Sequence, residues 1–266
     1  MISAVKYKTL DEHRTYLHEM VRLSLFFIHY WLETHPEETF SQTIRTRVDI
    51  YRKTEANPDQ QNQPRYLFDE EPWLKMEREA HCLYEKYKDD RAGFERNAFE
   101  VFRASVDSRC ERDFADCSIL ATHQCGSLRY NDGLWPDGKT MGFHIANAIA
   151  PRSFLSEPEH LKECFLHLMT IAEKVYGAVN IGTSTWLNSM PKWNAFFPHE
   201  WMNNRQEPVT KVNGYLSFWG QFVTARGTFH YRNAEYLRTT GSFPFYPRVS
   251  YCSIEAMRRK LGGENI

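Results

Sequence analysis

The residues best suited to chemistry are a cysteine and two histidines in the middle of the chain: His123, Cys125 and His144. The first two lie in the extended-looking stretch 117–130, and the third interrupts the apolar run 139–150. If these stretches form an antiparallel hairpin in which Tyr130 faces Lys139, Cys125 lies opposite His144. His123 then lies one diagonal step away on the same face.

Such a trio allows two kinds of chemistry. His144 can deprotonate Cys125 for attack on a carbonyl carbon, or His123, Cys125 and His144 can together bind a metal ion. A buried thiol beside two hydrogen-bonded histidines is the structural alternative. The prediction depends on register, because a slip of one residue moves a strand's side chains to the other face.

His144 is also a candidate general acid or base by itself, because an imidazole exchanges a proton near neutral pH. A core histidine with satisfied hydrogen bonds is the alternative. Polar residues follow at the end of the same strand, where a ligand needs them: Asn147, Arg152 and Ser153. We therefore predict His144 and Cys125 as catalytic residues and these three as substrate-binding residues.

A second group of polar and aromatic residues ends the predicted strands 178–187 and 215–223. Its members are Thr185, Trp186, Asn188, Trp219, Gln221 and Arg226. If the two strands are neighbours, this group surrounds one crevice. Amides, hydroxyls, indoles and a guanidinium suit a small polar metabolite with a carboxylate or amide. Buried tryptophans beside capping polar groups are the alternative.

The elements that must position these residues form a strand–helix–strand unit. The run 139–150 predicts a buried strand. Residues 158–176 carry apolar side chains at spacings of three and four, which predicts an amphipathic helix that Gly177 ends. The β-branched stretch 178–187 predicts a second strand, parallel to the first. In open α/β sheets, ligands bind beyond the carboxyl ends of such strands.

Helices dominate the first part of the chain. Thr9 and Glu12 have the spacing of a capping box, which predicts a helix up to about residue 34. Further helices are expected at 36–51, 71–88, 93–108, 190–203 (broken near Pro198), 232–239 and 253–261. The predicted fold is α+β or mixed α/β, a helical N-terminal layer followed by a mixed sheet with a hairpin and a βαβ crossover. Its predicted domains are a helical subdomain, 1–108, and an α/β core, 109–266, that carries the site.

The order hairpin, helix, strand, short helix, strand is similar to the second half of a family of coenzyme-A-dependent acyltransferases. Their pyrophosphate binds glycine-rich backbone amides at a helix start. The corresponding loop here, 150–160, has no glycine, and Glu157 and Glu159 would repel a phosphate. Phosphate loops, dinucleotide-binding fingerprints and the common hydrolase motifs are also missing from the sequence. The cofactor is therefore left unknown.

One further cluster has metal-like spacing on the predicted helix 158–176. It consists of His160, Glu163, Cys164 and His167. This face lies opposite the apolar stripe, so we expect the cluster to be solvated and predict no metal site there.

Composition narrows the class of protein. Lys plus Arg number 33 and Asp plus Glu number 34, and without a basic stripe we expect no nucleic-acid partner. The longest apolar run, 23–32, is too short to cross a membrane, and charges near the N-terminus argue against a signal peptide. We therefore expect a cytoplasmic protein with reduced thiols and, lacking paired CxxC motifs, no structural zinc.

Three functions fit these observations. The first is a cytoplasmic transferase or hydrolase that acts on a small polar acyl or amino-acid-like metabolite by acid/base, acyl-transfer-type chemistry at His144. Asn147, Asn188 or Gln221 would then stabilise developing negative charge. The second is a non-haem metal enzyme that uses His123, Cys125 and His144. The third is a non-catalytic small-molecule-binding or interaction protein. All three functions are compatible with a homo-oligomer.

Overall fold

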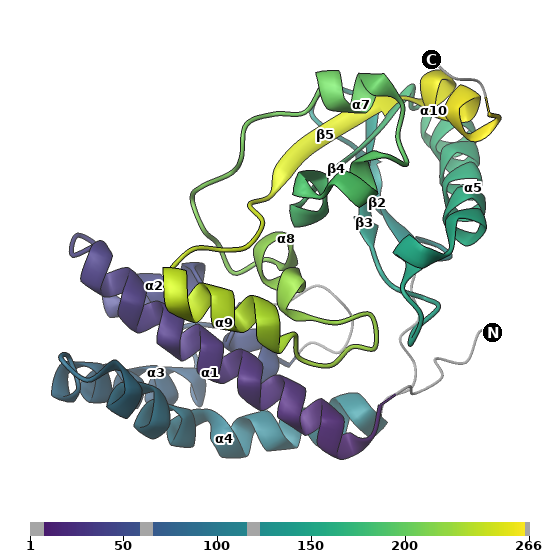
Figure 1. Cartoon of the computed structure of the whole chain (residues 1–266). Helices are drawn as coiled ribbons and strands as arrows, with labels where there is room; N and C mark the ends of the chain where they lie inside the picture. Colours follow the sequence, from purple (N-terminus) through teal and green to yellow (C-terminus); the bar gives the residue numbers. More distant parts are fainter. Residues whose placement is uncertain (1–7, 59–65, 116–122, 264–266) are drawn as a thin grey trace. The chain divides into compact units, whose positions relative to one another are not determined.

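The computed structural model describes residues 8–58, 66–115 and 123–263 (Figure 1). The chain divides into two compact units. The helical unit takes the chain up to residue 120, together with 212–215 and 219–244. The α/β unit takes 121–211, 216–218 and 245–266. Helices followed by a mixed sheet confirm the predicted α+β class, although residues 219–244, which the sequence placed with the sheet, belong to the helical unit.

The helical unit is organised around α1 (Leu10–Thr34). The capping box forms as predicted, because the Glu12 amide donates to Thr9 Oγ1 at 3.1 Å and the Thr9 amide donates to Glu12 Oε2 at 2.7 Å. Its other helices are α2 (Phe40–Thr46), η1 (Tyr51–Lys53), α3 (Trp73–Lys86), α4 (Arg91–Ala115), η4 (Gly220–Phe222) and α9 (Tyr231–Thr240). Helix α1 packs along α4 and α9.

The strand predicted at 215–223 is wrong. This stretch forms α8 (Leu216–Trp219) and η4. Trp219 and Phe222, three residues apart, place their rings 5.6 Å from each other, and Trp219 also contacts Phe27 and Phe243. A spacing of three is helical, but the many aromatic residues, which favour strands in general, concealed it.

The α/β unit is built on a sheet whose five described strands follow chain order. They are β1 (Gln124–Cys125), β2 (Leu128–Leu134), β3 (Thr140–Ile145), β4 (Asn180–Thr185) and β5 (Arg248–Ser253). Only β3 and β4 pair in parallel, and α5 (Pro158–Tyr176) connects them. The predicted hairpin, in β2 and β3, and the predicted crossover are thus confirmed. Strand β5 was not predicted.

One face of this sheet is closed by α5, beside which lies α10 (Ile254–Leu261) (Figure 1). The apolar stripe of α5 packs there as predicted, and Gly177 ends the helix with a φ of 64°. The buried strand side chains on this closed face are Cys125, Leu128, Met141, Phe143, Ile181 and Cys252. Shorter helices complete the unit: η2 (Phe154–Ser156), η3 (Trp186–Ser189), α6 (Pro191–Asn194) and α7 (His199–Asn203). The break predicted near Pro198 lies between α6 and α7.

The outer edge of β5 is occupied by an irregular segment that follows α7. The Gln206 amide donates to the Val249 carbonyl at 2.9 Å, and the Val209 amide donates to the Pro247 carbonyl at 2.8 Å. Arg248 Nη1 in turn donates to the Gln206 carbonyl at 3.0 Å. The segment therefore satisfies backbone groups of β5 without being a regular strand.

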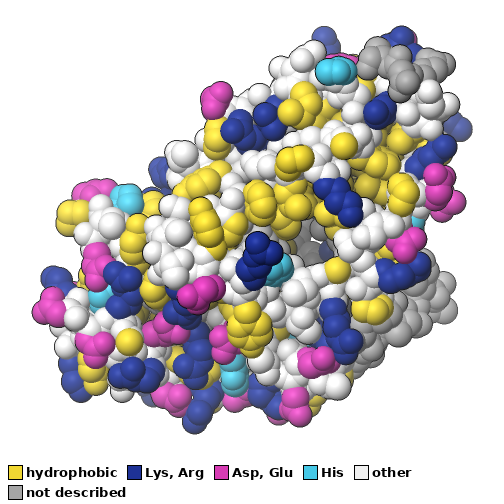
Figure 2. Space-filling model, in the orientation of Figure 1, with side chains coloured by type: hydrophobic (Ala, Val, Ile, Leu, Met, Phe, Trp, Pro, Cys, Tyr) yellow, Lys and Arg dark blue, Asp and Glu magenta, His cyan; other side chains and the backbone are white. Residues whose placement is uncertain are grey.

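None of the described helices combines the length and the apolar character that crossing a membrane requires. On the face of the molecule shown in Figure 2, acidic and basic side chains are interspersed and do not gather into a stripe.

Candidate functional site

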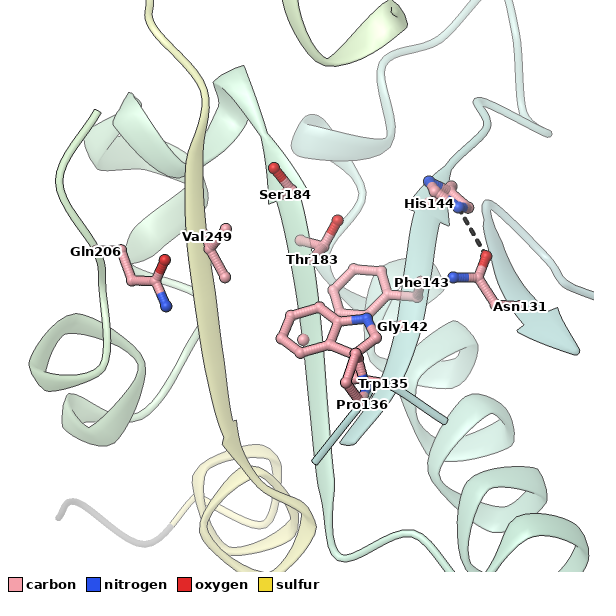
Figure 3. A pocket seen from close by; sticks show the side chains of 11 residues that line it. Asn131, Trp135, Pro136, Gly142, Phe143, His144, Thr183, Ser184, Gln206 and Val249 are labelled. Atoms are coloured by element: carbon pink, nitrogen blue, oxygen red, sulfur yellow. Dashed lines mark hydrogen bonds between the residues drawn. The ribbon is translucent and has the colours of Figure 1, made fainter. Parts of the chain in front are cut away.

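An open pocket of ≈ 430 Å³ lies on the sheet face opposite α5 (Figure 3). Because side chains alternate along a strand, the strand residues between the buried ones of β3 and β4 point to this open face. The side chains that matter for chemistry or binding are Asn131, Trp135, His144, Ser184, Gln206 and Val249. All of them belong to the α/β unit.

The floor of the pocket is the indole of Trp135, which lies over two glycines. Gly142 of β3 and Gly182 of β4 are register partners. A Cβ atom at Gly142 would lie 2.5 Å from Trp135 Nε1, and one at Gly182 would lie 2.6 Å from Trp135 Cη2. The two glycines therefore make room for the ring. Sequence reasoning missed Trp135, although a glycine inside a strand signals such a close approach.

His144 lies at the side of this pocket, hydrogen-bonded to Asn131. Its Nε2 is 2.8 Å from Asn131 Oδ1. With the amide oxygen as acceptor, Nε2 carries the proton, and Nδ1 keeps a lone pair on the side of the ring away from Asn131 (Figure 3). The residue as a whole is exposed, but its ring is partly withdrawn from solvent. That burial, together with the nearby charge of Arg129, lowers the pKa of His144, so the imidazole is neutral at pH 7.

Arg129 is the cross-strand partner of His144, so both side chains point to the open face. Its Nε is buried and has no hydrogen-bond partner among the described residues, and none of their carboxylates forms an ion pair with it. Burial lowers the pKa of Arg129, yet a guanidinium stays charged in proteins. A half-buried, unpaired cation is unfavourable, which makes Arg129 a candidate anion-binding group.

The predicted pairing of His144 with Cys125 is wrong. His144 faces Arg129, whereas Cys125 faces Leu128 across a tight turn between β1 and β2. Cys125 is 0% exposed and packs on the closed face, on the other side of the sheet from His144. Burial and the neighbouring Cys164 raise the pKa of the Cys125 thiol to about 11, so the thiol is almost entirely protonated at neutral pH.

The alternative metal site is not formed either. His123 has a φ of 61°, and its ring lies against Tyr130, with a centroid distance of 5.1 Å. Across 8–58, 66–115 and 123–263, no three side chains of the metal-binding types His, Cys, Asp and Glu come together. His123, Cys125 and His144 are therefore not a ligand set. The first part of the predicted strand, 117–122, lies outside the described residues.

The polar residues predicted after β3 organise the loop that leads to α5. Asn147 Nδ2 donates to the Arg152 carbonyl at 2.7 Å, and Arg152 pairs with Glu157 at 2.9 Å. Ser153 Oγ accepts from the Leu155 amide and caps η2. None of the three lines the pocket described above. Their observed contacts are those of a loop scaffold.

The residues predicted at the end of β4 have similar local contacts. Thr185 Oγ1 accepts from the Leu187 amide and caps η3, and the ring of Trp186 lies against Phe245. Asn188 is fully buried. Its Nδ2 donates to the carbonyls of Thr183 and Arg248, and its Oδ1 accepts from Trp193 Nε1. The amide of Asn188 thus joins β4, β5 and α6.

The residues predicted at the end of a later strand lie in the helical unit. Trp219 Nε1 is 3.1 Å from the carbonyl oxygens of Arg47 and Asn213. The Gln221 carbonyl accepts from Asn233 Nδ2, and Arg226 pairs with Glu12 at 3.1 Å. No strand exists there, so the predicted crevice between two neighbouring strand tips is wrong.

Cys164 of α5 was expected to be solvated but is buried. Its Sγ accepts from the Ser127 amide at 3.2 Å and lies 3.5 Å from His160 Nε2, which is also 2.8 Å from Ser127 Oγ. Gly126, with a φ of 57°, allows this, because a Cβ there would lie 2.4 Å from Cys164 Sγ. Burial raises the pKa of the Cys164 thiol, which makes it a packing residue.

Comparison with protein-family models, curated proteins and solved structures found no match to this chain.

Proposed function

We propose that the α/β unit is an enzyme that binds a small anionic acyl or amino-acid-like metabolite on its open sheet face, with His144 as general base. The observation that carries this proposal is one juxtaposition. A neutral, hydrogen-bonded imidazole stands at an open pocket, and its cross-strand neighbour is an arginine that forms no ion pair with any described residue.

Arg129 and two residues of the pocket lining each have a role in this proposal. Arg129 does not itself line the pocket but lies opposite His144 on the same sheet face, and its guanidinium offers two parallel donors to the substrate carboxylate. The indole of Trp135 provides an apolar surface for the remainder of the metabolite. Ser184, exposed on the same face of β4, offers a hydroxyl as a further hydrogen-bonding group.

In this arrangement, binding of the carboxylate at Arg129 changes the basicity of His144. Without a bound anion, the charge of Arg129 disfavours a second positive charge on His144. A bound carboxylate neutralises Arg129, so the basicity of His144 rises when substrate is present. Asn131 Oδ1 holds the Nε2 proton throughout, which leaves Nδ1 as the atom that takes the proton from the substrate.

The test is a ligand screen by saturation-transfer NMR with small carboxylates, each paired with its neutral amide. Carboxylates are expected to bind and their amides to bind at least tenfold more weakly, as a charge-assisted bidentate contact would require. Arg129→Gln should lose this preference. Arg152→Gln is the matched control, since Arg152 is an exposed arginine of the same unit that already pairs with Glu157 and does not face His144.

Turnover is followed with the carboxylates that bind. His144→Gln should keep binding and lose 10²- to 10⁴-fold in rate, roughly the usual contribution of a general base. Equal carboxylate binding by the Arg129 variant, or unchanged turnover by the His144 variant, would overturn the proposal.

A carboxylate-binding module without turnover is the second candidate. It is favoured by one observation: His144 is the one titratable side chain among the residues that line the described pocket, so no second acid or base accompanies it. Saturable binding without any product in the same NMR samples would decide for this candidate.

A further inference from the structure

Two hydrogen-bond donors of the open pocket have no role in the function proposed above. They are the side-chain amide nitrogen of Asn131 and the indole nitrogen of Trp135, and both residues line the pocket. Neither Asn131 Nδ2 nor Trp135 Nε1 has a hydrogen-bond partner among the described residues. Both nitrogens donate and neither can accept, so a ligand meets two donors at this end of the pocket.

The two nitrogens lie close together beside Gly142. A Cβ atom built on this glycine would lie 2.5 Å from Trp135 Nε1 and 2.8 Å from Asn131 Nδ2. The nitrogens are therefore no farther apart than the sum of these distances, 5.3 Å. In Figure 3 they lie on the facing sides of their two side chains. Since an N–H group donates to an oxygen at about 2.9 Å, one oxygen in the pocket can accept from both.

The amide of Asn131 is held in its orientation by His144. Asn131 Oδ1 accepts from His144 Nε2 at 2.8 Å, so the other end of the amide, Nδ2, points away from the imidazole. The same amide thus connects the proposed general base with the pair of donors. An oxygen bound at Nδ2 is consequently only two hydrogen bonds away from the imidazole.

Trp135 is held through both its backbone and its ring. Its amide donates to the Thr140 carbonyl at 2.8 Å, and its carbonyl accepts from the Gly138 amide at 2.9 Å. The indole lies against Gly142 and Gly182, where no side chain displaces it. The indole N–H is therefore in place before a ligand arrives, which lowers the cost of ordering the site on binding.

Two neighbouring N–H donors match an acceptor oxygen and mismatch an ammonium group. A carbonyl oxygen has two lone pairs and can accept both hydrogen bonds, whereas an ammonium group has only donors. Arg129, opposite His144 on the same sheet face, adds a positive charge that also disfavours an ammonium group. The pocket should therefore distinguish acyl metabolites from amino-acid-like ones, which the proposed function includes together.

We propose that Asn131 Nδ2 and Trp135 Nε1 bind a carbonyl oxygen of the metabolite, so that the substrate is an oxo or acyl acid and not an amino acid. This inference rests on the function proposed for the open sheet face and narrows its substrate class. Negative charge that develops on the bound oxygen would be stabilised by the same two donors. The residues predicted from the sequence for this role, Asn147, Asn188 and Gln221, do not line the pocket.

The experiment follows the indole N–H signals of the whole chain by two-dimensional ¹H–¹⁵N NMR. The probes are 2-oxobutanoate and 3-oxobutanoate, with butanoate and 2-aminobutanoate as references that contain the same carboxylate. At least one oxo acid should move the Trp135 Nε1–H signal downfield in a saturable way and further than either reference. It should also bind about 3- to 10-fold more tightly than butanoate, which is the usual contribution of a neutral hydrogen bond.

Trp135→Phe keeps an aromatic ring and removes the indole N–H, and the signal that disappears identifies Trp135. This variant should lose the preference for the oxo acid over butanoate while it still binds butanoate. Trp186→Phe is the matched control and should keep the preference, since Trp186 lies against Phe245 and does not line the pocket.

Asn131→Asp keeps an oxygen for His144 and removes the other donor. It should also lower the ratio of oxo-acid to butanoate affinity, and this ratio cancels the effect of the new charge on the common carboxylate.

The outcomes separate this inference from the proposed function. Equal binding of oxo acids and butanoate by the wild-type protein, or an unchanged preference in Trp135→Phe, would overturn the inference and leave the carboxylate site at Arg129 in place. Oxo-acid binding that depends on Trp135 but is not weakened in Arg129→Gln would support the donor pair and contradict the proposed function. Binding of none of the four acids would overturn both.

Discussion

The two faces of the sheet differ although the same strands build both. In β3, Met141 and Phe143 are buried under α5, whereas Gly142 and His144 point the other way, to the open pocket. In β4, Ile181 and Gly182 divide in the same manner. Large apolar residues hold the closed face, and glycines with one imidazole shape the open face. A strand of six residues thus places packing side chains on one face and pocket-lining residues on the other by alternation alone.

The largest expected effect comes from truncating the closed face. Phe143→Ala removes a ring that contacts Phe165 and Trp201, and should lower the free energy of unfolding by about 3–5 kcal/mol. His144→Gln, one residue later, should change it by less than about 0.5 kcal/mol, because an exposed side chain packs against little. Urea unfolding measures both. Similar losses for the two variants would mean that the open face is a packing face as well.

Thiol reactivity tests the closure of the same face. Because the pKa of Cys125 is about 11, only about one thiol in a thousand is ionised at pH 8. Labelling followed by peptide mass spectrometry should find Cys125 modified at least about 100-fold more slowly than the exposed Cys82. Unfolding in urea should remove the difference. Equal rates in the folded protein would show that the closed face opens readily.

A methyl group on the open face should have an intermediate effect. In Gly142→Ala the new Cβ would meet Trp135 and Asn131, and we expect a loss of about 1–3 kcal/mol in unfolding free energy, as for other overpacked sites. The same substitution in a Trp135→Ala background should cost less, since the indole is then gone. Ser184→Ala, on the same face, is the control and should be nearly neutral. If Gly142→Ala lowered the free energy of unfolding equally in both backgrounds, the loss would not come from contact with the Trp135 ring.

The smallest effect is a change in titration. By NMR, His144 should titrate below the usual 6.5, and Arg129→Gln should raise its pKa by removing a neighbouring positive charge. Arg152→Gln should leave the pKa unchanged. Since the folded pKa is lowered, the unfolded chain binds the proton more tightly, and His144 reduces stability as pH falls through about 6.5 towards the folded value. An unchanged pKa in the Arg129 variant would show that the charge of Arg129 does not act on His144.

Local patterns in the sequence predicted the framework of the α/β unit. The helix from Pro158 to Tyr176 has the predicted ends because its proline, its apolar stripe and Gly177 lie within the helix or next to it. The parallel crossover from β3 to β4 followed from that helix and two apolar strands. His144 was singled out for interrupting an apolar run, and it does line the pocket.

The neighbours of His144 could not be predicted because they depend on register. Strand β2 continues to Leu134, which pairs with Met141, and an irregularity lies between Tyr130 and Leu134. The register therefore differs from the predicted one, and Arg129 takes the place opposite His144 that was expected for Cys125. Local propensity contains no information about which residues meet across strands. Strand β5 was missed for a related reason: its buried residues include Ser250 and Cys252, which are not strong strand formers.

The segment that hydrogen-bonds the outer edge of β5 has a consequence for self-association. Sheet edges with free backbone donors and acceptors recruit strands from other molecules and start aggregation. Here the carbonyls of Pro247 and Val249 already accept from Val209 and Gln206. A second copy could pair with β5 only after the segment around Gln206 and Val209 had given up these hydrogen bonds. The segment therefore disfavours edge-to-edge association of the sheet on that side.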